Sequence, residues 1–208
     1  ILVLETLKGN RLYMIKNVCV FASSCNFLDE IYYMEASNLG RLLGQNGFNM
    51  IYGGSSLGLM WSCAKNVKES GGKIIGIMPE KLKDMAENSK DCDEFFVTKG
   101  MRERKAKMDE MSEAVIALPG GFGTLEELSE MIVQKQLGYN KKAIVILNTN
   151  GFYDNLLKFF DDILEQKFAY KRARELYYVA KSAKEAIEYL KSYKESTLEI
   201  TKEELYAR

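Results

Sequence analysis

Short apolar runs alternate with longer amphipathic runs along most of the chain. The apolar runs are typical of strands and occupy Asn17–Ala22, Phe48–Tyr52, Lys73–Met78, Glu94–Val97, Ala114–Leu118, Ala143–Leu147 and Leu176–Ala180. The amphipathic runs predict helices over Phe27–Gln45, Leu57–Ser70, Gly100–Met111, Thr124–Leu137, Phe152–Gln166 and Ala183–Leu190. Several strands are nearly all apolar, which is expected where helices cover both faces of a sheet. The alternation predicts a single doubly wound α/β domain with a mostly parallel sheet and right-handed crossovers.

The predicted domain covers residues 14–193. Residues 1–13 precede the first strand-like run and are treated as an N-terminal extension. The charge-rich residues 194–208 are predicted to form a tail or a peripheral helix. No apolar stretch approaches the ~20 residues that a membrane-spanning helix needs, so no membrane partner is expected.

Composition narrows the possible chemistry. The chain has 208 residues, and its 29 Lys and Arg residues balance its 29 Asp and Glu residues, so no general attraction to nucleic acid is expected. It contains no His, which excludes Ser-His-Asp and Cys-His nucleophiles, a His general base, and most zinc and haem sites. Its 4 Cys residues show no C-x-x-C spacing, which favours reduced thiols in a cytoplasmic protein over a metal or redox site.

Two glycine-rich turns follow predicted strands, the first over Tyr52–Met60 and the second over Pro119–Glu127. Glycines bring bare N–H groups close to an anion, and the helix that follows adds its positive dipole end. Ligands of an open parallel sheet bind where strands end, so two such turns favour a phosphate or nucleotide cradle. The alternative is that the glycines only make tight turns. Neither turn has the Gly-Lys-Ser/Thr of a P-loop or the full dinucleotide fingerprint.

The predicted helix Gly100–Met111 places two cations on its inward half. Helical spacing puts Met101, Met108, Met111 and Ser112 on one stripe, Arg104 and Lys105 on either side of Met108, and Arg102, Glu103 and Lys107 outward. Cations on a buried-facing side need an anionic partner or a wet cleft. A ligand phosphate is one such partner, and snorkelling stems or internal salt bridges are the alternatives.

Two interpretations of Glu127 stay open at this point. Thr124-x-x-Glu127 fits a capping box, in which Thr124 is the N-cap and Glu127 reaches back to its N–H. In the other interpretation Glu127 faces a ligand at the start of the helix, and Glu126 complements the helix dipole instead.

With these motifs the sequence resembles the LOG ("lonely guy") family of cytokinin-activating phosphoribohydrolases, which also carries the label "lysine decarboxylase-like". The family's P-G-G-x-G-T-x-x-E motif matches Pro119 to Glu127 at every fixed position. Its Arg-Lys pair, followed by Ala and Met, matches Arg104-Lys105-Ala106 and Met108, and its first glycine turn matches Gly53-Gly54 and Gly58-Leu59-Met60. The resemblance covers roughly residues 17–190.

The resemblance implies a homodimeric, Rossmann-like hydrolase that needs no metal or organic cofactor. Its substrate would be an N6-substituted adenosine 5′-monophosphate, cleaved at the N-glycosidic bond to free base and ribose 5-phosphate. The catalytic roles fall on Arg104 and Glu127. The substrate contacts fall on Gly54, Ser55, Arg104, Lys105, Gly120, Gly121, Phe122, Gly123, Thr124, Leu125, Glu126 and Glu127. Such a cleavage builds positive charge on the ribose, which a carboxylate near C1′ stabilises.

Some positions depart from the family pattern and leave the N6 substituent open. Arg102 stands where the family often has His, Ser55 replaces a glycine, Trp61 replaces another, Val133 replaces a Thr, and an acidic substrate contact falls on Ala86 with Glu87 beside it. Two other functions are weighed against hydrolysis. A nucleotide or molybdopterin-type carrier would bind without reaction. A decarboxylase would need a Schiff-base Lys for pyridoxal phosphate, and no Lys stands out in that role.

Overall fold

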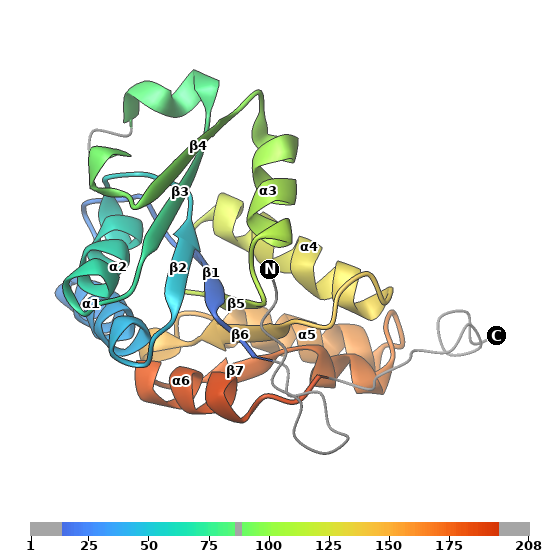
Figure 1. The fold of residues 1–208 in the computed structure, drawn as a ribbon. Coiled ribbons are helices and arrows are strands. Elements are labelled where there is room, and N and C mark those ends of the chain that lie inside the picture. The colour runs from blue at the N-terminus through green and yellow to red at the C-terminus, as the bar shows by residue number, and fades with distance from the viewer. Residues whose placement is uncertain (1–13, 86–88, 196–208) are drawn as a thin grey trace, which may run out of the picture.

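The computed structural model describes residues 14–85 and 89–195 (Figure 1). The strands are β1 (Asn17–Phe21), β2 (Asn49–Tyr52), β3 (Ile74–Pro79), β4 (Glu94–Thr98), β5 (Ala114–Ala117), β6 (Ala143–Leu147) and β7 (Tyr178–Ala180). The α-helices are α1 (Glu30–Gln45), α2 (Gly58–Glu69), α3 (Met101–Glu110), α4 (Phe122–Gln136), α5 (Asp154–Glu165) and α6 (Ala183–Ser192). Short 3₁₀ helices are η1 (Glu80–Met85), η2 (Ser89–Asp91), η3 (Thr149–Gly151) and η4 (Lys171–Leu176). Residues 1–13, residues 86–88, and residues 196–208 of the predicted tail lie outside the described residues.

The strands form one parallel sheet in the order β4-β3-β2-β1-β5-β6-β7. From β1 the chain builds outward to β4, crosses back through α3 to β5, and then builds outward to β7 in the other direction (Figure 1). In the register Val18 lies opposite Met50 of β2 on one side and opposite Ala114 of β5 on the other. This topology confirms the predicted doubly wound α/β fold.

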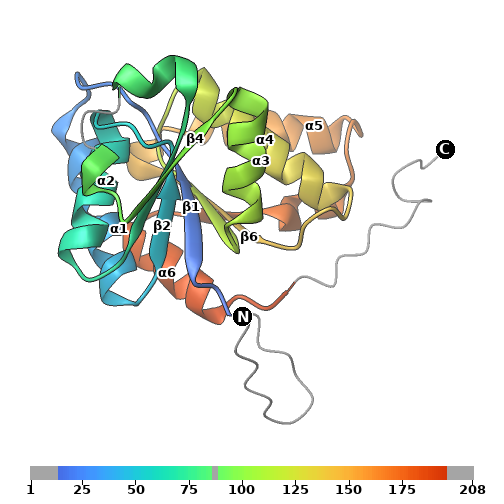
Figure 2. The same cartoon turned by 45° about the horizontal axis from the view of Figure 1, so that its top comes forward.

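Helices cover both faces of the sheet. Helices α1, α2 and α6 pack on one face, and α3, α4 and α5 pack on the other (Figures 1 and 2). Since side chains alternate along a strand, Val18 and Val20 join the first core while Cys19 and Phe21 join the second. A strand covered on both sides has no solvent-facing position, which explains why β1 and β6 read as continuous apolar runs.

The structure corrects some element boundaries. Helix α1 begins at Glu30 rather than Phe27, because Asp29 has the extended backbone of an N-cap residue. Helix α4 begins at Phe122, two residues before the predicted Thr124. Strand β7 begins at Tyr178, because Leu176 closes η4. No helix in residues 14–85 and 89–195 has the length and apolar character needed to cross a membrane.

Candidate active site

The carboxyl ends of β1 and β5 meet where the chain reverses the direction in which it adds strands. Ligands of doubly wound sheets bind in the crevice outside such a switch point. The two glycine turns follow β2 and β5, and β1 lies between these two strands. The turns therefore flank the loop that follows β1.

The loop after β1 holds the two turns together, and no sequence motif indicated it. The Ser23 N–H donates to the Pro119 carbonyl oxygen at 3.2 Å, and the Ser23 carbonyl oxygen accepts the Leu59 N–H at 2.9 Å. The Asn26 side-chain oxygen accepts the N–H of Gly58, the first residue of α2, at 2.8 Å. The one available signal was positional, since the loop after the first strand of such a sheet reaches the switch point whatever its residues.

Helix α3 brings Arg104 to Glu127 of α4. The Arg104 Nη1 donates to Glu127 Oε1 at 3.0 Å, and its Nε donates to the Ile77 carbonyl oxygen of β3 at 3.0 Å. Both side chains are nearly buried, with 11% and 10% of their surface exposed. Because the two side chains are buried, either charge would be poorly solvated without the other, so each charge depends on the ion pair. Of the alternatives for Arg104, an internal ion pair is therefore present in the chain itself.

Lys105, next to Arg104, pairs with carboxylates of α4. Its Nζ contacts Glu126 Oε1, and it lies 2.8 Å from Glu130 Oε2. These hydrogen bonds raise the pKa of Lys105 above its ordinary value. Two carboxylates around one ammonium leave this cluster with a net negative charge.

The inward stripe predicted for α3 holds at Met108 but is wrong at Met101. Met108 is 1% exposed, whereas Met101 is 47% exposed. Met101 is the first residue of the helix, about two turns before Met108 on the same stripe, and only Met108 joins the core between the helix and the sheet. The prediction that Arg102 and Glu103 point outward agrees with their exposure.

The start of α4 excludes the capping-box interpretation. The N-cap is Gly121, and no side chain caps the helix. Thr124 lies inside the first turn and is buried, and Glu127 bonds to Arg104 instead of reaching back. The turn leaves Gly121, Phe122 and Gly123 exposed, so the start of this helix, whose first N–H groups have no partner within the helix, lies in an exposed segment.

The first glycine turn lies on the other side of the pair. Gly54 has a left-handed backbone with φ of 72°, and Ser55 is 7% exposed. The Ser55 hydroxyl oxygen accepts the Leu57 N–H at 3.3 Å. Arg104 reaches back beneath this turn as far as Gly53, so the arginine links the two turns in addition to the loop after β1.

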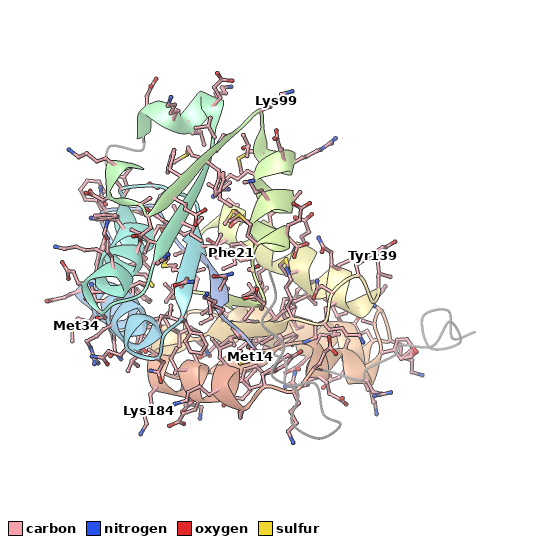
Figure 3. The ribbon with its side chains drawn as sticks, viewed as in Figure 1. Met14, Phe21, Met34, Lys99, Tyr139 and Lys184 are labelled. Atoms are coloured by element: carbon pink, nitrogen blue, oxygen red, sulfur yellow. The ribbon has the colours of Figure 1, made fainter. Side chains whose placement is uncertain are left out.

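A groove of about 400 Å³ opens between α3 and α4 beside Glu127. Its floor is apolar and comes from Cys19, Phe21, Val115 and Met131. Figure 3 labels Phe21 near the middle of the molecule, at the carboxyl end of β1. The charged walls of the groove come from Arg102, Lys105, Asp109, Glu110, Glu127 and Glu130. The groove gives the Glu127 carboxyl an open space on its side of the ion pair.

Burial raises the pKa of Glu127 above a glutamate's usual value, and the Arg104 charge and hydrogen bond oppose that rise. The carboxyl is thus balanced between an environment that favours its protonated form and a cation that favours its ionised form. Carboxyls of this kind are typical of acid–base and electrostatic roles in catalysis.

The fold and this site define a Rossmann-like α/β protein with a buried carboxylate at its switch point. A family profile described as "possible lysine decarboxylase" matches residues 60–190. The chain is 40% identical to cytokinin riboside 5′-monophosphate phosphoribohydrolase LOG5 of Arabidopsis thaliana over 86% of this chain and 78% of that protein. It is 37% identical to the corresponding enzyme LOG of Oryza sativa subsp. japonica over 89% of this chain and 76% of that protein. The chain belongs to the LOG family.

Solved structures share the fold. The Moco carrier protein of Chlamydomonas reinhardtii superposes with a TM-score of 0.64 at 25% identity, covering 85% of this chain and 95% of that one. The molybdenum cofactor binding protein of Rippkaea orientalis superposes with a TM-score of 0.60 at 24% identity, over 85% and 94% of the two chains.

The described positions that depart from the family pattern lie in different parts of the fold. Arg102 lines the groove, Trp61 packs against the first core, and Val133 is 51% exposed on α4. Ala86 and Glu87, where an acidic substrate contact was expected, lie outside the described residues.

Proposed function

We propose that this chain hydrolyses the N-glycosidic bond of an N6-substituted adenosine 5′-monophosphate, releasing the free base and ribose 5-phosphate. The observation that carries the proposal is the buried Arg104–Glu127 pair, whose glutamate lines the open groove between α3 and α4. The names of the Arabidopsis and rice relatives describe this activity, and their similarity extends over most of the chain.

Glu127 is the group that acts at the sugar. One of its oxygens is held by Arg104, and the carboxyl also borders the groove. As the C1′–N bond breaks, its electron pair stays with the base nitrogen and positive charge develops at C1′. The negative carboxylate stabilises that charge and takes a proton from the attacking water, whose oxygen bonds to C1′; the proton then passes to the base.

Arg104 keeps Glu127 ionised and oriented, since a buried carboxylate without a cation would take up a proton. The 5′-phosphate is assigned to the open start of α4, where the N–H groups of Gly121, Gly123 and Thr124 supply donors and the helix dipole favours an anion. Lys105 borders the groove between α3 and α4, where a substrate would compete with Glu126 and Glu130 for its ammonium. Anchoring through the distant phosphate places the sugar over the acid.

The test is to incubate the protein with AMP, N6-isopentenyl-AMP and the unphosphorylated isopentenyl riboside, and to assay the released base. At least one of the two monophosphates should be cleaved, and base should be released from the riboside far more slowly than from that monophosphate. Glu127→Gln should lose about 100-fold or more of the activity, while Glu69→Gln, on the exposed side of α2, should retain it. Full turnover by Glu127→Gln, or equal cleavage of the riboside, would contradict the proposal.

The resemblance to the family further supports a homodimer. Helix α5 has no buried residue although its apolar side chains line one side, and a second, apolar groove of about 170 Å³ lies between α4, α5 and η4. Phe159 of α5 and Phe168, which follows that helix, are 59% and 81% exposed. Sedimentation equilibrium should give twice the chain mass, and Phe159→Glu should shift it to one chain mass.

The four cysteines are all free thiols, which fits the proposed cytoplasmic location.

A carrier of a nucleotide or a molybdopterin is the second candidate, because a Moco carrier protein shares the fold at a TM-score of 0.64. A carrier would bind its ligand, and so raise the unfolding temperature, without forming product. The same incubations distinguish the two: base release supports hydrolysis, and thermal protection without base release supports the carrier.

A further inference from the structure

Gly53 lies directly against the guanidinium of Arg104. A Cβ atom placed on Gly53 would lie 2.3 Å from Arg104 Nη2 and 3.5 Å from its Cζ. Real side-chain carbons do not approach a nitrogen so closely, so one of the two groups would have to move. The backbone of Gly53 is not in the left-handed region, so it is space and not conformation that requires glycine at this position.

Two further groups contact the guanidinium. Its Nε donates to the Ile77 carbonyl oxygen and its Nη1 donates to Glu127. The Met60 sulfur is 3.1 Å from the same Cβ position, so that position is enclosed by a side chain as well. Gly53, the Ile77 carbonyl and the Glu127 carboxyl thus lie around the Arg104 guanidinium.

We propose that Gly53 is a positioning residue for the reaction: by leaving room for Nη2, it fixes the Arg104 guanidinium at the distance where it holds the Glu127 carboxyl. This inference rests on the proposed function for its catalytic part. It assigns to the first glycine turn a role other than a phosphate cradle, because Arg104 already occupies the space beneath Gly53.

The surroundings of Gly53 determine which of the two groups would move. The Ile77 carbonyl belongs to β3 in the interior of the sheet, and Gly53 directly follows β2 beside it, so neither backbone yields easily. A methyl group on Gly53 would therefore displace the side chain of Arg104, which is the flexible partner. The Glu127 carboxyl would then lose part of its hydrogen bond and its nearest positive charge while staying buried.

Gly53→Ala tests the inference, with Gly100→Ala as the matched control. Gly100 is the N-cap residue just before the helix that carries Arg104, it has an extended backbone with φ of −167°, and nothing lies within 4 Å of its Cβ position. Gly53→Ala should lower kcat about 10- to 100-fold, as expected for a misplaced catalytic group. KM for the monophosphate should change little, because the phosphate is anchored at the start of α4. Gly100→Ala should match the wild type.

A pH profile separates positioning from simple structural damage. In Gly53→Ala the acidic limb of kcat should move to higher pH, because Glu127 loses its cation and ionises less readily. A wild-type kcat, or a lower kcat with an unmoved acidic limb, would overturn the inference.

A double-variant cycle on unfolding temperature tests the same contact without any substrate. Arg104→Ala removes the group that a Gly53 methyl would strike, so the loss of unfolding temperature caused by Gly53→Ala should largely disappear in the double variant. Additive losses would overturn the inference, as would a double variant that fails to fold while Arg104→Ala folds. If Gly53→Ala alone does not fold, recovery in the double variant supports it. Absence of base release by the wild type would refute the proposed function, and this cycle would still decide the contact.

Discussion

The Tyr153 hydroxyl donates to the carbonyl oxygen of Leu118 at 2.7 Å. Tyr153 comes from the connection after β6, and Leu118 is the residue before Pro119 and the second glycine turn. Both residues are buried, at 4% and 0% exposure. A side chain from the neighbouring strand's connection therefore fixes the point from which the turn leaves the sheet.

Tyr153→Phe should lower the free energy of unfolding by about 1–3 kcal/mol, because it leaves the buried Leu118 carbonyl without this donor. Urea denaturation measures the change. Tyr139→Phe is the control, since Tyr139 is 80% exposed and should change stability by less than about 0.5 kcal/mol. Equal effects of the two substitutions would show that the Tyr153 hydrogen bond contributes nothing.

Much of the fold could be predicted from the sequence because hydrophobic burial acts along every strand. The apolar run over Ala143–Leu147 coincides with β6, and the other runs locate their strands to within a residue or two. Boundaries governed by local caps were less predictable. The backbone of Asp29 and the glycine N-cap of α4 depend on a few backbone angles that periodicity does not report.

The candidate site was predictable only in part. Helical spacing placed Arg104 on the buried side of α3, but nothing in the spacing identifies Glu127 as its partner, because the two are 23 residues apart. The pairing follows from the crossover that carries the chain from β4 to β5. The contact of Gly53 with Arg104 is likewise a matter of distances between segments that only the folded chain brings together.

The pH dependence of catalysis should reflect the buried carboxyl. Since burial raises the pKa of Glu127 and the reaction needs its ionised form, kcat should fall with decreasing pH at a value above the ~4.3 of an ordinary glutamate. A pH–rate profile with N6-isopentenyl-AMP measures this limb. A limb at or below the ordinary value would mean that Arg104 outweighs burial.

Lys135 should give the chain extra stability at alkaline pH. It is 5% exposed, and its Nζ donates to the Lys142 carbonyl oxygen and to the Tyr193 hydroxyl. None of the ion pairs among the described residues includes it, and burial lowers its pKa to about 8. Between this value and the ~10.4 of an unfolded Lys, the unfolded chain binds the extra proton, so the free energy of unfolding rises with pH.

Lys135→Met removes this titration and isolates its effect. Relative to the variant, the wild type should gain on the order of 1–3 kcal/mol between pH 7.5 and pH 10, as about two units of pKa difference imply. Urea denaturation at several pH values measures both proteins. Parallel stability curves would show that Lys135 titrates normally.

Gly58 should be much less tolerant of substitution than another glycine with a left-handed backbone. Its φ is 58°, and a Cβ there would lie 2.5 Å from the Ser24 carbonyl carbon, in the loop after β1. Gly71 has φ of 92° and open space around its Cβ position. Alanine at Gly71 should cost about 1–2 kcal/mol for the backbone alone, and alanine at Gly58 should cost about 1–3 kcal/mol more for the collision. Equal urea midpoints would mean that the loop moves aside freely.

The strands that precede α3 and the strands that follow it meet at the border between β1 and β5. The groups around the Arg104 guanidinium come from both of these parts of the chain. Arg104 and Glu127 belong to the part of the chain after β4, whereas Gly53 and the Ile77 carbonyl belong to the part before α3. Neither half of the polypeptide could therefore assemble the guanidinium's surroundings by itself. A polypeptide cut between β4 and α3 would therefore regain this chemistry only if its two fragments joined along the β1–β5 edge.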